Sequence, residues 1–102
     1  MADEPFTLDS LDDVIHGRLR LGVMAYLSTA ESADFNTLKA RTQASDGNLS
    51  VQLRKLEEAA YVRIDKSFSG KKPLTTVILT DEGRSAYIRY LDALRALVGG
   101  AL

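Results

Sequence analysis

The spacing of apolar residues changes from a helical to an alternating pattern near residue 60, and this change constrains the fold more than any other feature. Before it, apolar residues recur at the interval of an α-helix, as Leu49, Leu53 and Leu56 do. After it, YVRIDKSF alternates apolar and polar side chains, and TTVILT is rich in β-branched residues. The expected result is a helical unit followed by a β-hairpin.

Helices are expected on both sides of this hairpin. The stretch LDSLDDVIHGRLRLGVMAYLS predicts a first helical region with a bend or a join at Gly17. A short second helix is predicted over 34–41, and a third over 46–59 after a cluster of turn and capping residues. A long last helix follows Thr80, which is placed to cap it. This order of elements predicts a mainly helical α+β fold.

Length and composition limit the class of protein. The 102 residues fit one domain, and 45% hydrophobic with 26% charged residues is typical of a globular chain. There is no cysteine, which excludes disulfides and thiolate metal sites. The first residues, MADEPFTLDSLDD, are acidic, unlike a secretory signal, and no apolar run approaches the roughly 20 residues of a membrane span. We expect one cytoplasmic domain over residues 1–102.

Charge is distributed unevenly along the chain. The net charge of −1 by itself argues against a nucleic-acid partner. Residues 1–38, however, carry a net charge of −5, and residues 39–72 carry +4. A basic segment within a nearly neutral protein indicates a surface for a polyanion.

The helices over 34–41 and 46–59, joined by a tight turn, have the arrangement of a helix-turn-helix. In such a unit the second helix enters the DNA major groove, and its first residues contact base edges. Asn48 suits adenine, Arg54 suits guanine or phosphate, and Val51 suits a thymine methyl group. These residues therefore predict a recognition helix for duplex DNA.

The hairpin tip, about residues 67–75, adds a polar basic loop that can reach the DNA backbone or the minor groove. The aromatic side chains expected to pack in the core or at the root of this hairpin are Tyr26, Tyr61 and Phe68. The residues predicted to contact DNA are Ser45, Gly47, Asn48, Ser50, Val51, Gln52, Arg54, Lys55, Lys66, Ser69, Lys71 and Lys72.

The sequence resembles the small single-domain winged-helix transcriptional regulators related to the MarR and ArsR groups. The resemblance covers about 8–97 and rests on LRLGVMAYL, ADFNTLKARTQASDGNLSVQLRKLEEAAYV and SFSGKKPLTTVILTDEGRSAY. It implies a winged helix-turn-helix: three helices, a two-stranded wing and a long C-terminal helix, with duplex DNA as the partner and a homodimer as the active species. The sequence departs from this family at Ala60, where glycine is usual, so the turn into the strand must form without glycine.

The residues themselves also favour a homodimer. The apolar surface of the last helix is broader than one stripe, and the first helical region supplies a possible complement. Pairing through these helices would place two recognition helices roughly 34 Å apart, about one DNA turn. The alternative is that both helices pack only on their own domain. The predicted interface residues are Leu11, Val14, Ile15, Tyr87, Tyr90, Leu91, Leu94, Leu97 and Val98.

No catalytic, metal or cofactor site is predicted. The acidic pairs 12–13 and 57–58 point to different helix faces, and no nucleophile has a base and an orienting acid. His16 is the single histidine, and a metal site needs several converging ligands. The leading hypothesis is thus a non-enzymatic regulator that binds a short two-fold-symmetric operator. Two alternatives remain open: a winged-helix protein-protein adaptor without DNA binding, and a regulator that responds to a small-molecule effector at the dimer junction.

Overall fold

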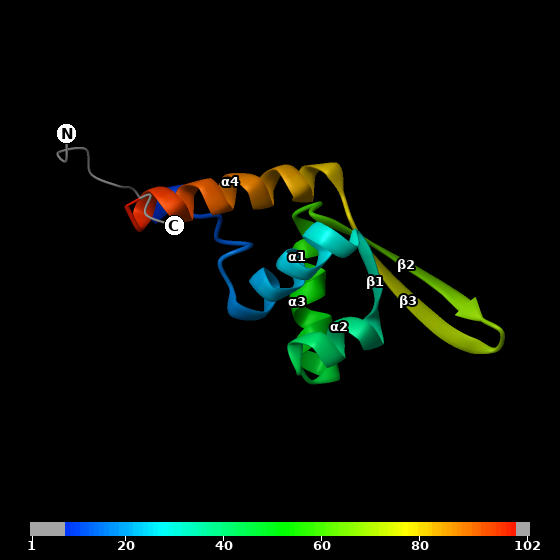
Figure 1. Cartoon of the computed structure of the whole chain (residues 1–102). Helices are drawn as coiled ribbons and strands as arrows, with labels where there is room; N and C mark the ends of the chain where they lie inside the picture. Colours follow the sequence, from blue (N-terminus) through cyan, green and yellow to red (C-terminus); the bar gives the residue numbers. More distant parts are fainter. Residues whose placement is uncertain (1–7, 100–102) are drawn as a thin grey trace.

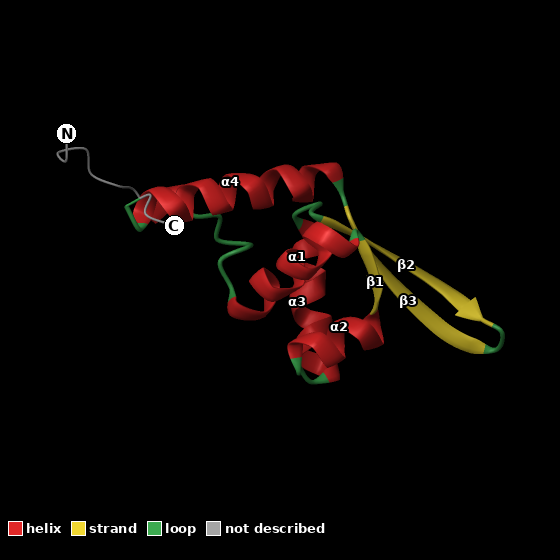
Figure 2. Cartoon of the chain, viewed as in Figure 1, coloured by secondary structure: helices red, strands yellow, loops and turns green. Residues whose placement is uncertain are grey.

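The computed structural model describes residues 8–99. The helical body, formed by α1 to α3, carries the hairpin β2–β3 on one side, while α4 extends away on the other (Figure 1). Helices dominate and the strands form one small sheet (Figure 2), which confirms the predicted mainly helical α+β fold. The elements in chain order are the 3-10 helix η1 (Leu8–Ser10), α1 (Arg18–Ala30), β1 (Ser32–Asp34), α2 (Phe35–Thr42), α3 (Asp46–Glu58), β2 (Val62–Ser69), β3 (Lys72–Leu79) and α4 (Asp81–Leu97).

The sheet is antiparallel with the strand order β1-β3-β2. Its central strand, β3, pairs along its whole length with β2 and near its end with β1. The sequence did not predict β1, because three residues are too few to show an alternating pattern. By pairing with β3, this short strand ties the root of the hairpin to the start of α2.

The hairpin turn is tighter than the sequence predicted. A loop was expected over about 67–75, but the strands continue as far as the pair Ser69 and Lys72, so that only Gly70 and Lys71 form the turn. Two-residue turns that match the twist of a hairpin need a positive φ at their first position, and Gly70, with φ 65°, supplies it without a steric penalty. The wing is therefore a regular ribbon almost to its end.

Side-chain caps fix the starts of three helices. The Asp34 carboxylate accepts a hydrogen bond from the Thr37 N–H (2.7 Å), and this bond lowers the pKa of Asp34. The Thr80 hydroxyl accepts from the Gly83 N–H (2.9 Å), as predicted for the last helix. Ser45 caps α3 in the same way. These caps account for the close agreement of α2 and α3 with the predicted ranges.

The segment before α1 is not an α-helix, and here the prediction was wrong. The Asp12 carboxylate accepts hydrogen bonds from the backbone N–H groups of Val14 (2.8 Å) and Ile15 (3.3 Å). A turn closed by an aspartate side chain competes with the helical backbone pattern and replaces it here. Gly17 does mark a boundary, since α1 begins at the next residue, but it follows a turn and does not join two α-helices.

This turn carries Leu11 and Ile15 into the chain's own core, together with Tyr90 of α4. Their exposed fractions are 8%, 0% and 2%, respectively. The prediction that these three residues form a subunit interface is therefore corrected, because their apolar surface is already buried within one chain. The rest of the core is Val23, Met24, Leu27, Leu38, Leu49, Leu53, Leu56, Val62, Val77 and Ala86.

α3 ends in a Schellman motif. The Tyr61 N–H donates to the Leu56 carbonyl (3.0 Å), and the Ala60 N–H donates to the Glu57 carbonyl (2.9 Å). Ala60 has φ 67°, the left-handed conformation in which a side chain is unfavourable and glycine is not. The turn thus forms without glycine, as the sequence requires, but with a strained alanine.

Tyr61 anchors the segment before α1. Its hydroxyl donates to the Asp12 carboxylate, and its carbonyl accepts the Thr80 N–H (3.1 Å). Burial and, to a lesser extent, the hydrogen bond to Asp12 together raise the pKa of Tyr61 to about 12. The neutral phenol is therefore the form that the fold stabilises.

Ala60→Gly is expected to stabilise the protein by about 0.5–1 kcal/mol, because glycine adopts positive φ without the penalty that alanine carries. Ala59, one residue earlier, has φ −82° in the right-handed region, so Ala59→Gly should instead destabilise. Urea unfolding of both variants measures the difference. A loss of stability in Ala60→Gly would contradict the strain assigned to this corner.

Tyr61→Phe is expected to lower the free energy of unfolding by about 1 kcal/mol near neutral pH. Since the Tyr61 pKa is about 12 in the folded chain against 10.0 for a free tyrosine, this contribution is complete below pH 10 and disappears as pH rises toward 12. The free energies of unfolding of wild type and variant, measured by urea titration between pH 8 and 12, should therefore approach each other as the pH rises. Tyr26→Phe serves as the control, because no hydrogen bond of the Tyr26 hydroxyl is found among residues 8–99.

Candidate nucleic-acid interface

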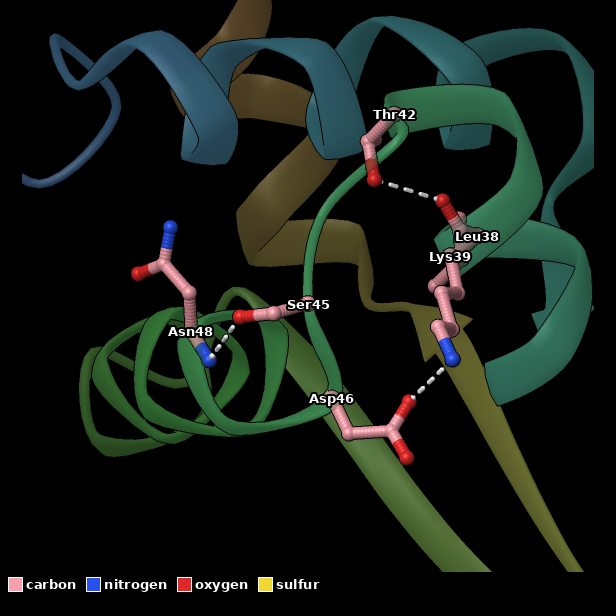
Figure 3. Close-up of polar contacts among 6 residues, drawn as sticks. All are labelled: Leu38, Lys39, Thr42, Ser45, Asp46 and Asn48. Atoms are coloured by element: carbon pink, nitrogen blue, oxygen red, sulfur yellow. Dashed lines mark hydrogen bonds and ion pairs between the residues drawn. The ribbon is translucent and has the colours of Figure 1, made fainter.

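The turn between α2 and α3 determines where the first residues of α3 point. The Thr42 hydroxyl donates to the Leu38 carbonyl (2.7 Å) at the end of α2, and Gln43 follows in the left-handed conformation with φ 58°. Across the turn, the Lys39 ammonium lies 2.7 Å from an Asp46 carboxylate oxygen (Figure 3). These contacts hold α2 and α3 in the predicted helix-turn-helix arrangement.

α3 buries one face and exposes the other. Leu49, Leu53 and Leu56 are at most 2% exposed. Val51 lies on the opposite side with 47% of its surface exposed. The predicted contact residues that share this exposed face are Ser45, Gly47, Asn48, Ser50, Val51, Arg54 and Lys55.

The basic side chains of this face have no acidic partner. Within residues 8–99, neither Arg54 nor Lys55 lies within 4 Å of a carboxylate oxygen, while the nearby Asp46 is paired with Lys39. The positive charge on the exposed side of α3 is therefore available to an external anion.

A groove of about 690 Å³ separates α3 from the wing. Ser50 and Arg54 line it from α3, together with the acidic Asp46 and Glu57, and Lys66 lines it from β2. Lys66 thus joins the polar face of α3, whereas Ser69, Lys71 and Lys72 stand at the hairpin tip, away from the helices (Figure 1). The structure brings the predicted residues together as two patches on the same chain, one on α3 and one on the wing tip.

Phe68 corrects one expectation of the sequence. It was expected to pack at the root of the hairpin, but it is 71% exposed and pairs with Pro73 near the tip. Strand alternation places it on the same face as Lys66, the face that lines the groove. The wing therefore offers an exposed aromatic ring beside its lysines.

A second cleft, of about 820 Å³, lies on the other side of α3, between α1 and the end of α2. Arg18 and Arg41 line it together with Asn48, and the Arg41 guanidinium lies 5.4 Å from the centre of the Tyr26 ring. Sequence reasoning missed both arginines because they come from different helices, and only tertiary packing brings them beside α3.

Gln52 differs from its predicted neighbours. It is half-buried, its side-chain oxygen accepts a hydrogen bond from Arg20, and its nitrogen donates to Asn48 (3.1 Å). Both of its polar atoms are thus already engaged within the chain. Its predicted contact with DNA stays a prediction, but the structure gives it a second role beside Asn48.

Residues 8–99 were also compared with the requirements of a metal site and of a membrane-spanning helix. No group of three or more histidine, aspartate or glutamate side chains among residues 8–99 is arranged to hold a metal ion. In the same range, no helix has both the length and the apolar character needed to cross a membrane.

The fold and the two basic patches can now be compared with known proteins. The family model described as winged helix DNA-binding domain matches residues 19–98. The chain belongs to this family. The match includes the whole helix-turn-helix, the wing and α4, so that the winged helix inferred from the resemblance is confirmed.

Members and structural neighbours agree with this assignment. The uncharacterized protein MJ0432 of Methanocaldococcus jannaschii is 33% identical over 78 residues, which cover 76% of this chain and 85% of that protein. The structure of a transcriptional regulator homologue from Pyrococcus horikoshii superposes with a TM-score of 0.80 and 30% identity, covering 85% of this chain and 86% of that one. Sco3205, a MarR family regulator from Streptomyces coelicolor whose structure is a complex with DNA, has a TM-score of 0.67 and 24% identity; the match covers 92% of this chain and 65% of that one.

Proposed function

We propose that this chain is a homodimeric transcriptional regulator that binds a short two-fold-symmetric site in duplex DNA. The observation that carries the proposal is the exposed face of α3, where Arg54 and Lys55 are unpaired within residues 8–99 and Val51 is 47% exposed. A helix of this kind fits the major groove, with the wing lysines on the adjacent backbone or in the minor groove. The complex of Sco3205 with DNA supports this use of the same fold.

The dimer is proposed from α4. Tyr87, Leu91, Leu94 and Val98 follow one another at intervals of four, three and four residues, the spacing of an apolar seam between paired helices. Leu91 and Val98 are 37% and 47% exposed, and this seam is displaced from the face that Tyr90 buries in the core. With the 53% exposed Ile88 beside it, the seam offers a continuous apolar surface for a second copy.

The corrected interface is therefore narrower than the one inferred from sequence. It retains Tyr87, Leu91, Leu94 and Val98 as contacts between subunits. Tyr87 and Leu94 are half-buried against the chain's own core, so that Leu91 and Val98 are the more exposed members of the seam. Val14 and Leu97 are likewise half-buried and stay predicted contacts at the edge of the interface. Because α4 extends away from the helical body (Figure 1), two copies can pair along it and leave both α3 helices exposed.

A protein-binding adaptor is the alternative, and two observations favour it: Glu57 and Glu58 are exposed on α3, and Phe68 is 71% exposed on the wing. Salt separates the two functions. Affinity for DNA should fall at least about tenfold between 50 and 200 mM salt, whereas an apolar protein interface should respond little.

Arg54→Ala and Lys71→Ala are expected to weaken DNA binding in different ways. The DNA is selected first, by incubating the protein with fragmented genomic DNA at low salt and sequencing the bound fragments. Arg54→Ala should reduce affinity for the selected site by about 1–3 kcal/mol and relax the sequence preference. Lys71→Ala should reduce affinity for all sequences alike and lower the slope of log affinity against log salt by about one.

Arg89→Ala is the matched control for this experiment. Arg89 is an exposed arginine on α4, so its removal changes the net charge equally without touching α3 or the wing. The affinity of Arg89→Ala for the selected DNA site should stay within about twofold of the wild-type value. Selection of no DNA by folded wild-type protein at low salt would refute DNA binding and favour the adaptor.

Leu91→Glu is expected to convert the dimer into monomers, because it places a charge in the middle of the apolar seam. Ala96→Glu adds the same charge at an exposed position on the opposite side of α4 and should leave the dimer intact. Analytical ultracentrifugation gives the mass of each species. A monomeric wild type, or a dimeric Leu91→Glu, would rule out the seam as the interface.

A further inference from the structure

Arg20 holds together two parts of the chain that are distant in sequence. Its guanidinium donates hydrogen bonds to the backbone carbonyls of Val14 and Asp13 (3.4 Å for the latter) in the segment before α1. It also donates to the side-chain oxygen of Gln52 on α3. Arg20 thus connects the segment before α1 directly to Gln52, a half-buried residue beside the exposed face of α3.

The chemistry of Arg20 fixes the orientation of two amide groups. A guanidinium carries only donors, so the atom of Gln52 that faces it must be the oxygen, Oε1. Gln52 Nε2 then faces Asn48 at 3.1 Å. Because an amide nitrogen only donates, the Asn48 atom that accepts this hydrogen bond must be Oδ1. The Nδ2 group of Asn48, with its two donors, is left for an external partner.

On this basis we infer that Arg20 is a positioning residue that sets the base preference of Asn48. The inference rests on the proposed DNA-binding function. Adenine is recognised best when an asparagine presents both its oxygen and its nitrogen, whereas guanine offers two acceptors, N7 and O6. Gln52 occupies one of the two lone pairs of Asn48 Oδ1, so the amide held in this orientation still presents one acceptor beside its Nδ2 donors, the combination that adenine requires.

Gly17 makes this arrangement possible and also offers a way to test it. A Cβ atom at Gly17 would lie 2.5 Å from a guanidinium nitrogen of Arg20 and 2.6 Å from its central carbon. The Gly17 backbone, at φ −129° and ψ 137°, suits any residue. Gly17→Ala should therefore displace the Arg20 side chain without straining the backbone and without changing the charge of the protein.

The test compares sequence preference among variants by selection from randomised duplex DNA. Wild type should prefer adenine over guanine at one position by about fivefold or more, and Asn48→Ala should abolish that preference. Gly17→Ala and Arg20→Met release the Gln52 and Asn48 amides and should reduce this preference to about twofold or less. Arg20→Lys, which keeps a donor-only group, should preserve the preference for adenine.

Arg18→Met is the matched control for charge. Arg18 lines the same cleft but makes no hydrogen bond to Gln52, so its loss should weaken binding to all sequences equally and leave the base preference unchanged. If Arg20→Met fails to fold, Gln52→Met removes the amide that orients Asn48 and should show the same loss of preference for adenine. An unchanged base preference in Gly17→Ala and Gln52→Met would overturn the inference, as would a wild type with no preference for adenine that depends on Asn48.

A measurement without DNA separates this inference from the proposed function. The side-chain NH₂ signals of Asn48 and Gln52 in the free protein should shift in Gly17→Ala and Arg20→Met but not in Arg18→Met. If these shifts occur and no variant, including wild type, binds DNA, the proposed function fails while the connection stands. Absent shifts refute the connection even when DNA binding is intact.

Discussion

The corner formed by Ala60 and Tyr61 is the point on which the rest of the structure depends. α3 ends there, β2 begins there, and the Thr80 hydroxyl donates to the carbonyls of Ala60 (2.7 Å) and Tyr61 (3.0 Å). A Cβ atom at Gly83 would lie 2.0 Å from the Tyr61 carbonyl oxygen, so α4 approaches this closely only because position 83 is glycine. The directions of the recognition helix, the wing and α4 are therefore fixed by contacts to one short piece of backbone.

The same corner keeps two surfaces apart. The basic patches lie on α3 and the wing, whereas the apolar seam lies on α4, and no side chain serves both. The Tyr61 hydroxyl extends the corner to Asp12, in the segment whose Val14 carbonyl holds Arg20. A contact at the end of α3 thus contributes to the placement of side chains near its beginning, through a segment that lies outside the helix-turn-helix itself.

Local sequence predicted those parts of the fold that local interactions form. α3 was predicted to within one residue because its apolar spacing and the Ser45 cap are both encoded within the helix. β1 was not, since its three residues are strand only through pairing with β3. The segment before α1 has apolar residues at helical spacing, but the Asp12 side chain closes a turn that the spacing does not reveal.

The candidate site divides in the same way. Residues of α3 could be assigned to its exposed face from the helical period alone, and the structure places Val51 and Arg54 there. The cleft beside α3 could not be predicted, because Arg18 and Arg41 reach it from two other helices. The orientation of Asn48 depends likewise on Arg20, which is 28 residues away in the sequence.

The electrostatics of α3 show why a net charge of −1 is compatible with binding a polyanion. At physiological ionic strength charges act over about 8 Å, so the local arrangement matters more than the total. Asp46 is paired with Lys39 at 2.7 Å, whereas Glu57 and Glu58 follow Arg54 and Lys55 on the same helix. Because residues 39–72 carry a net charge of +4 and residues 1–38 carry −5, a polyanion is attracted to one segment of the chain and not to the other, and such an arrangement favours specific docking over general affinity for nucleic acid.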